Sequence, residues 1–216
     1  MLLALAAPLP AADMLYVTLT DNTIVSYDTS SGNAATIAAS VATFASTNLN
    51  TPRGLAFDTS GNLYAANYSN STISKFDSSG VYQSNITSNL NSPTGLAIDS
   101  SGNLYAANIG NSTISKFNSS GAYVSSGSIP STNLTGPFGL AIDSSGNLYA
   151  ANYGNSTISK FDSSGSFLTS WSTGSAKPSF LAFKPVSVPE PSTYALAAIA
   201  TGVMAYLARR RKARKG

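Results

Sequence analysis

Apolar and polar residues alternate in short runs along most of the chain, and turn-forming residues separate the runs. In the stretch 93–124 four such runs follow one another, at residues 95–99, 104–107, 113–117 and 122–124. Asn, Ser and Gly stand at the breaks, a pattern that predicts an antiparallel meander of short strands rather than helices. In the third run we expect Ile114 and Phe117 to face the core. Ser115 and Lys116 are expected to face solvent.

This unit recurs with nearly the same letters along the chain. PFGLAIDSSGNLYAANYGNSTISKF begins at Pro137, and closely similar stretches begin at Pro93 and Pro52. A further proline at 178 follows, so that these prolines are 41, 44 and 41 residues apart. A period of this length is typical of repeat architectures. Four short strands per unit, with Gly and Asn at the corners, predict the blade of a β-propeller.

The pattern P-x-G-[IL]-A-x-D-x-x-G-N-[LV]-Y resembles the NHL repeat of β-propellers, and also the repeats of gluconolactonase-like and streptogramin-lyase-like propellers. The resemblance covers residues 14–184 and implies an all-β propeller domain; a single C-terminal transmembrane helix is expected after it from the tail alone. The resemblance does not imply one function, because propellers carry many unrelated functions. The chain departs from the pattern at the end of the second strand, where these repeats usually read Ala-Asp and this chain has Asn67, Asn108 and Asn152.

The number of blades depends on how the two ends of the repeat region combine. Residues 14–50 form a partial repeat without the strand that opens the other units, and a strand of that kind recurs alone at residues 178–183. We expect these two pieces to share one composite blade, because closing the ring removes exposed strand edges. Three full repeats and one composite blade predict a closed propeller of four blades. An open arc, or a ring completed by a second molecule, is the alternative.

The C-terminal end combines three segments: a linker with a Pro-Glu-Pro motif at 185–193, an apolar stretch at 194–208 and a basic run at 209–216. No charged residue falls between Pro191 and Ala208, and 18 residues are near the lower limit for a membrane-spanning helix. The basic run would remain cytoplasmic and would place the propeller outside. The tail therefore predicts a transmembrane helix as the contact with the membrane.

This order of motif, helix and basic run resembles the PEP-CTERM sorting signal of bacteria. The resemblance implies processing by an exosortase, an inner-membrane intermediate with the propeller outside, and a final place at the cell surface or in the medium. The sorting motif comprises Val188, Pro189, Glu190, Pro191, Ser192 and Thr193. The basic stop-transfer residues are Arg209, Arg210, Arg211, Lys212, Arg214 and Lys215. Residues 1–13 resemble the end of a secretory signal peptide without its basic start.

Charge and composition exclude several classes of function. The chain has 12 basic and 9 acidic residues, but six basic residues lie in 209–216, so residues 1–208 carry 6 basic and 9 acidic residues, a net charge of −3. Such a domain is not expected to bind nucleic acid. There is no cysteine and no histidine, and the only glutamate is Glu190. Because proton transfer near neutral pH then lacks its usual groups, we expect no enzyme, no cofactor and no metal site. A degenerate metal-dependent lyase or lactonase is the alternative.

Two repeated sets of side chains are candidates for binding. The amides at the ends of the second strands predict either a ligand rim for sugar hydroxyls or caps on tight loops, and they are Asn67, Asn108 and Asn152. The Asp-x-Ser-Gly-Asn corners before the second strands each hold one carboxylate, from Asp58, Asp99 or Asp143. Since a calcium site needs several oxygen ligands, these carboxylates favour turn caps over calcium ligands.

Three other features have simpler interpretations. The lysines of the third strand are expected to form a solvated face that discourages edge pairing, and they are Lys75, Lys116 and Lys160. The tyrosines of the second strand are expected to pack between blades with their hydroxyls at a rim, and they are Tyr64, Tyr105 and Tyr149. We expect the single tryptophan, Trp171, to pack locally rather than to bind sugar.

These observations predict an exported, non-catalytic binding, adhesion or matrix module at the cell surface or outside the cell. Its expected partners are exopolysaccharide or an envelope protein, besides the exosortase. A membrane-tethered periplasmic propeller that binds proteins is a further alternative, as is a structural protein with no ligand.

Overall fold

The computed structural model describes residues 14–30 and 34–183. The first sheet contains β1 (Met14–Thr18), β2 (Ile24–Asp28) and β3 (Ala42–Ala45). The second contains β4 (Pro52–Phe57), β5 (Leu63–Asn67), β6 (Thr72–Phe76) and β7 (Tyr82–Ile86). The third contains β8 (Pro93–Ile98), β9 (Leu104–Asn108) and β10 (Thr113–Phe117). The fourth contains β11 (Pro137–Ile142), β12 (Leu148–Asn152), β13 (Thr157–Phe161) and β14 (Phe167–Ser172).

The tail and the N-terminal end lie outside the described residues. The signal-peptide expectation at 1–13 falls there, as do the sorting motif, the transmembrane helix at 194–208 and the basic run at 209–216. Within the part of the chain that is described, no helix is long and apolar enough to cross a membrane.

Antiparallel sheets make up this part of the chain, as the repeat predicts, and the second to fourth sheets share one register. Each opens with a P-x-G-L-A strand, and the leucine of its second strand lies opposite the phenylalanine of its third: Leu63–Phe76, Leu104–Phe117 and Leu148–Phe161. The sequence pattern did not predict α1 (Ala34–Ala39), a six-residue helix between β2 and β3. Four of its six residues are alanine, which has the highest intrinsic helix propensity.

Both faces of each inner sheet are buried, which corrects the expectation that Ser115 and Lys116 face solvent together. Ile114 packs in the cluster between the third and fourth sheets, whereas Phe117 packs in the cluster between the second and third. Neighbouring strand residues point to opposite faces, so Ser115 shares a face with Phe117 and is buried as well. The one-sided interpretation was wrong because a sheet between two other sheets has no solvent face.

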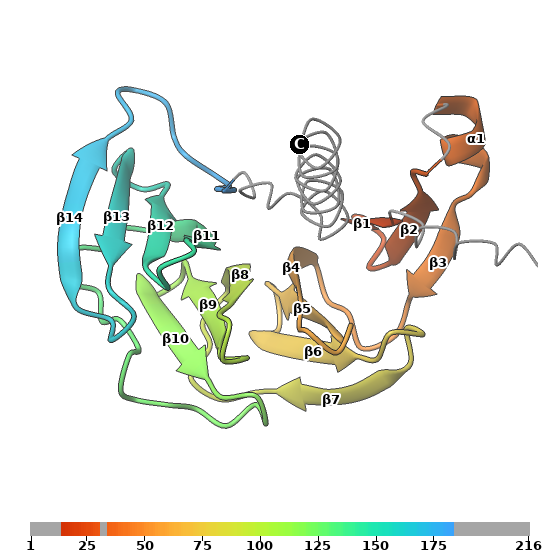
Figure 1. Cartoon of the computed structure of the whole chain (residues 1–216), viewed down its shortest axis with the longest axis horizontal. Coiled ribbons are helices and arrows are strands. Elements are labelled where there is room, and N and C mark those ends of the chain that lie inside the picture. The colour runs from red at the N-terminus through yellow and green to blue at the C-terminus, as the bar shows by residue number, and fades with distance from the viewer. Residues whose placement is uncertain (1–13, 31–33, 184–216) are drawn as a thin grey trace, which may run out of the picture. The chain divides into compact units, whose positions relative to one another are not determined.

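Successive sheets meet through the backbones of their first strands, β4, β8 and β11, in chain order (Figure 1). A Cβ atom on Gly54 would overlap the carbonyl oxygen of Thr94, and one on Gly95 would overlap that of Phe138. Glycine is therefore required here by close approach of two backbones. The contact repeats once more, since Gly139 lies against the backbone of residues 179–180.

The composite blade is not formed in the structure. Residues 178–183 occupy the place beside β11 that β11 occupies beside β8, but they contain no strand. Among the described residues, β1 pairs with β2 alone. The expected four closed blades are therefore four separate sheets, of which the first lacks the strand that residues 178–183 were expected to supply.

Candidate functional site

The repeated amides are structural rather than ligand-facing. Asn108 is fully buried, and its Nδ2 donates hydrogen bonds to Thr113 Oγ1 at 3.1 Å and Ser115 Oγ at 2.9 Å. Its Oδ1 accepts a hydrogen bond from the Asn91 backbone at 3.0 Å. Asn67 and Asn152 are equally buried and make the same kinds of contact. The predicted ligand rim is therefore absent, and the loop-capping alternative describes these residues.

The repeated aspartates cap their turns, as their sequence context indicated. Asp58 Oδ1 accepts hydrogen bonds from the backbones of Ser60 and Asn62, both at 2.9 Å, and Oδ2 accepts from Asn62 Nδ2 at 2.8 Å. Partial burial acts to raise the pKa of Asp58, but these hydrogen bonds together outweigh it and lower the pKa. No group of three or more His, Cys, Asp or Glu residues is placed for a metal ion in the described part of the chain.

The repeated lysines lie over tyrosine rings on the neighbouring strand. Lys116 Nζ is 5.3 Å from the ring centroid of Tyr105, and the other two pairs have distances of 5.2 Å. Lys75 and Lys160 lie on strands that are paired on both sides, so they do not protect sheet edges as we expected. The tyrosine prediction is confirmed for Tyr105, which packs between the third and fourth sheets and donates to Asp99 at 3.3 Å. Burial raises the pKa of Tyr105.

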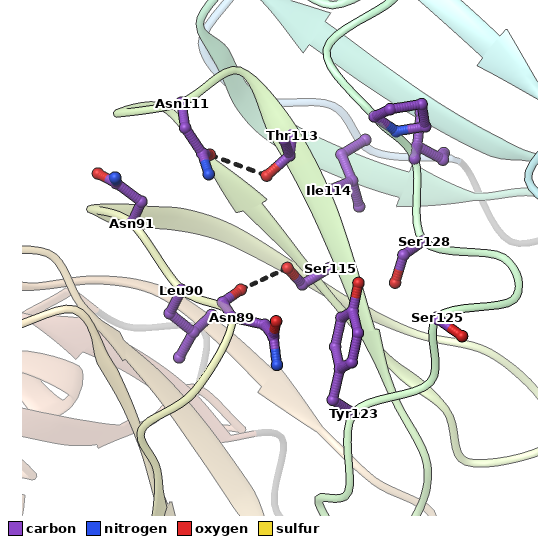
Figure 2. Close-up of a pocket in the computed structure, with 12 residues that line it drawn as sticks. Asn89, Leu90, Asn91, Asn111, Thr113, Ile114, Ser115, Tyr123, Ser125 and Ser128 are labelled. Carbon is purple, nitrogen blue, oxygen red and sulfur yellow. Dashed lines mark hydrogen bonds between the residues drawn. The ribbon is translucent and has the colours of Figure 1, made fainter.

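A cavity of about 400 Å³ beside the third sheet is the best candidate for a binding site (Figure 2). Its walls come from the loop before β8, from the start of β10 and from the segment after β10. Within residues 14–30 and 34–183 no charged side chain lines it, and the polar lining residues are Asn89, Asn91, Asn111, Thr113, Ser115, Tyr123, Ser125 and Ser128. Leu90, Ile114, Ile129 and Pro130 supply the apolar part of the wall.

This cavity exists because the third repeat is irregular. The second and fourth sheets have a fourth strand, whereas residues 122–130 make only isolated bridges, Phe117 to Tyr123 and Ile114 to Ile129. The segment leaves β10 between these two bridges, and Ser128 Oγ accepts a hydrogen bond from the Lys116 backbone in place of a regular ladder. The longer interval in the sequence, 44 residues against 41, was the signal for this site. The near-identity of the repeats drew attention away from it.

Several polar groups of the cavity are available to a ligand. Thr113 Oγ1 donates to Asn111 Oδ1 at 2.8 Å, and Ser115 Oγ donates to the backbone oxygen of Asn89 (Figure 2). Among the described residues, no hydrogen bond engages the side-chain amide of Asn89, Nδ2 of Asn111 or the Tyr123 hydroxyl. The ring of Tyr123 is 41% exposed and contacts Phe117 edge-on at a centroid distance of 6.0 Å. The cavity thus offers uncharged donors and acceptors beside an aromatic ring.

A second cavity, of about 330 Å³, lies among the first strands of the sheets. Its walls include glycine and leucine residues of β4, β8 and β11, together with Tyr16 and Phe180. Arg53 is the only charged residue among the described residues that line it, and the guanidinium lies 3.6 Å from the ring centroid of Tyr68. This cavity holds no carboxylate that could pair with a base or a metal.

Comparison with protein families finds two matches. Residues 49–76 match the NHL repeat, and residues 187–212 match the PEP-CTERM protein-sorting motif. The chain therefore carries an NHL-type repeat and the sorting motif of proteins that an exosortase processes, which implies export and association with the membrane or cell surface. No curated protein sequence matches the chain significantly.

The similar solved structures are β-propellers. Virginiamycin B lyase from Staphylococcus aureus has a TM-score of 0.60 and 17% identity, over 81% of this chain and 61% of that one. A chain in the nidogen–laminin complex has a TM-score of 0.61 and 19% identity, over 74% and 59%. A streptogramin B lyase has a TM-score of 0.51 and 18% identity, over 60% and 43%. At these identities the likeness concerns the fold, and the chain spans about 43–61% of these propellers.

Proposed function

We propose that this protein is an exported, exosortase-sorted propeller-like module that binds a neutral polysaccharide in the cavity beside Tyr123 and catalyses no reaction. The observation that carries the proposal is the lining of that cavity, which combines amides and hydroxyls with an exposed ring and contains no charged group.

The chemistry of the cavity matches that of a neutral sugar. Each sugar hydroxyl both donates and accepts hydrogen bonds, and an Asn side chain offers both functions, as do Ser and Tyr hydroxyls. The free groups of Asn89, Asn111 and Tyr123 come from three separate segments and line the same space. Aromatic rings with one polar end favour ligands that are partly apolar and partly hydrated, such as the faces of sugar rings. An anionic or cationic ligand would find no opposite charge there.

The absence of catalysis is supported by the composition and by the use of the carboxylates. The chain has no histidine or cysteine, and its only glutamate lies in the sorting motif. The turn aspartates accept several hydrogen bonds each, and the hydrogen bonds lower the pKa of Asp143 against the opposing effect of burial. A carboxyl held in this way is a poor general base near neutral pH.

Sugar binding is tested with the full chain in detergent, titrated with neutral polysaccharide from the producing cells. Tyr123→Ala should weaken binding roughly tenfold, which corresponds to about 1.4 kcal/mol. Tyr82→Ala is the matched control, since Tyr82 packs on Phe76 at 6.1 Å as Tyr123 packs on Phe117, but it lies outside the cavity. Equal binding by both variants, or no binding of any neutral glycan, would contradict the proposal.

A lyase or lactonase is the second candidate, because the fold resembles that of virginiamycin B lyase. It is distinguished by incubating the full chain with lactone substrates and divalent metal ions in turn. Turnover that requires a metal ion would establish this candidate. No turnover with any of the ions would leave the binding role.

Sorting is tested by an epitope tag placed after Gly174, where a Cβ atom would meet nothing within 4 Å. The tagged protein should leave the cell in a form shortened at its C-terminus only when the exosortase is present. Glu190→Ala should prevent the shortening. A full-length protein that stays in the inner membrane in both strains would instead indicate a tethered periplasmic module.

A further inference from the structure

The first sheet has an edge without a partner. In the other sheets the strand that corresponds to β1 is covered by a P-x-G-L-A strand, as β5 is by β4. Among the described residues, β1 has only β2 beside it. An unpaired edge is a template for another strand, and it carries apolar side chains here, with Leu15 52% exposed.

Only one segment of the chain has the missing pattern and is unpaired. The pattern Pro-x-x-Leu-Ala followed by Phe or Ile occurs four times, at residues 52–57, 93–98, 137–142 and 178–183. The first three are β4, β8 and β11, which are paired. Residues 178–183 lie against Gly139 of β11, in the position of a first strand, and no strand is paired with them in the described structure.

The outer faces of the first and fourth sheets are also complementary. Between the third and fourth sheets, Tyr105 and Ile114 of the third sheet pack in one cluster with Leu148 and Phe161 of the fourth. The same face of the fourth sheet borders an apolar cavity of about 410 Å³, lined by residues that include Tyr149, Ile158 and the 46%-exposed Trp171. The unmatched face of the first sheet carries the corresponding apolar residues, Leu15, Val17 and Tyr27, at the aligned repeat positions.

We propose that residues 178–183 of one chain pair with β1 of a second copy, so that two chains share two composite blades. Within one chain β1 and residues 178–183 are not paired in the structure, although both line the second cavity, of about 330 Å³. The described residues therefore leave two complementary elements without a strand partner, β1 and residues 178–183. A second copy supplies the missing strand to each.

The pairing uses each chain twice in the same way. Each copy offers one β1 edge and one 178–183 segment, so two identical junctions pair both β1 edges and both 178–183 segments. Contacts between unlike surfaces form a closed ring only if the rotations between successive copies add up to a full turn, which for two copies is a half-turn each. Phe180 is 67% exposed and Phe183 is 47% exposed, and both would be covered at the junction.

Engineered disulfides test the pairing, because the chain has no cysteine of its own. By analogy with Leu55–Ala65 and its equivalents, Leu181 should lie opposite Val17 of the other copy. Opposed residues in an antiparallel pair have Cα atoms about 4.5–5.5 Å apart, within the range for a disulfide. Full-length Val17→Cys and Leu181→Cys chains with different tags are mixed in detergent and oxidised. We expect a disulfide-linked species that carries both tags.

The control replaces Val17→Cys by Thr59→Cys, an exposed turn residue outside the junction, and should give no such species. The unmodified chain should sediment at twice its mass of 22.1 kDa, apart from bound detergent. In a single chain that carries both Val17→Cys and Leu181→Cys, a disulfide within one chain of monomer mass would overturn the proposal, because the ring would then close on itself. Sedimentation of the unmodified chain as a monomer would overturn it independently of any variant. Larger open assemblies would overturn the pairing of two chains.

Discussion

The buried amide of Asn108 should be one of the most sensitive positions for stability in the third sheet. It connects three segments: its own strand β9, the loop before β8 through the Asn91 backbone, and β10 through Thr113 and Ser115. Asn108→Ala removes all three hydrogen bonds and leaves a backbone N–H without its acceptor. At about 1 kcal/mol for each bond, the free energy of unfolding should fall by about 3 kcal/mol.

Thermal unfolding of the full chain in detergent measures this loss. For a protein of this length 1 kcal/mol corresponds to about 2–4 °C, so we expect the Tm to fall by about 6–12 °C. Asn70→Ala is the control, because Asn70 is exposed and accepts one hydrogen bond, from Thr72 at 3.0 Å. Its Tm should change by no more than about 2 °C. A fall of less than about 2 °C for Asn108→Ala would refute the view that the amide joins the three segments.

Asn108→Asp separates the contribution of the hydrogen bonds that the amide donates from that of the hydrogen bond it accepts. The carboxylate keeps the acceptor for the Asn91 backbone but has no N–H to donate. The hydroxyls of Thr113 and Ser115 already donate elsewhere, to Asn111 and to the Asn89 backbone, so they cannot serve the carboxylate without losing those bonds. We expect a Tm loss between those of Asn108→Ala and the control. A variant as stable as the parent would show that the donor half is dispensable.

Two further predictions concern the backbone contacts and the turns. Gly95→Ala should lower the free energy of unfolding by about 1–3 kcal/mol in the same assay, because its Cβ would overlap the Phe138 carbonyl oxygen, and an unchanged Tm would contradict the close approach. Acid should also destabilise the protein. The pKa values of Asp58 and Asp143 are lowered in the folded state, so the stability they contribute is present above the ordinary aspartate pKa of 3.8 and is lost as the pH falls through the folded values. Chemical unfolding between pH 6 and pH 2 should show this loss, and constant stability down to pH 2 would contradict it.

The repeat pattern predicts most of the strands and turns of the fold, but it does not predict the burial or contacts of single side chains. Turn residues and alternation identify the strands, and a turn aspartate such as Asp58 acts as the cap that its neighbours imply. Alternation within one strand cannot show how many faces are covered, so it predicts a solvent-facing Ser115 and does not decide between a ligand rim and a loop cap for Asn108. Both are buried because sheets lie on either side of them.

The features that the repeats share do not predict the candidate site, because the site lies where the third repeat departs from the others. The groups that line it, such as Tyr123 and Asn89, have no binding pattern of their own in the sequence. Only the length of the third interval distinguishes their repeat. How a longer connection folds depends on contacts distant in sequence, such as the pairing of Ile129 with Ile114. The helix α1 was missed for a similar reason, since it occupies a connection rather than a repeated strand.

The glycine contacts between neighbouring first strands limit how such a chain can lengthen by gene duplication. A unit that begins with glycine at its third position lets the following unit approach backbone to backbone, as Gly54 does for β8. The last segment carries Phe180 at that position, so a unit that follows it packs on a phenylalanine ring instead of approaching backbone to backbone. Duplication of an internal unit keeps glycine at each new contact. Lengthened descendants of this chain should therefore have gained units before residue 178, with the phenylalanine segment kept at the end.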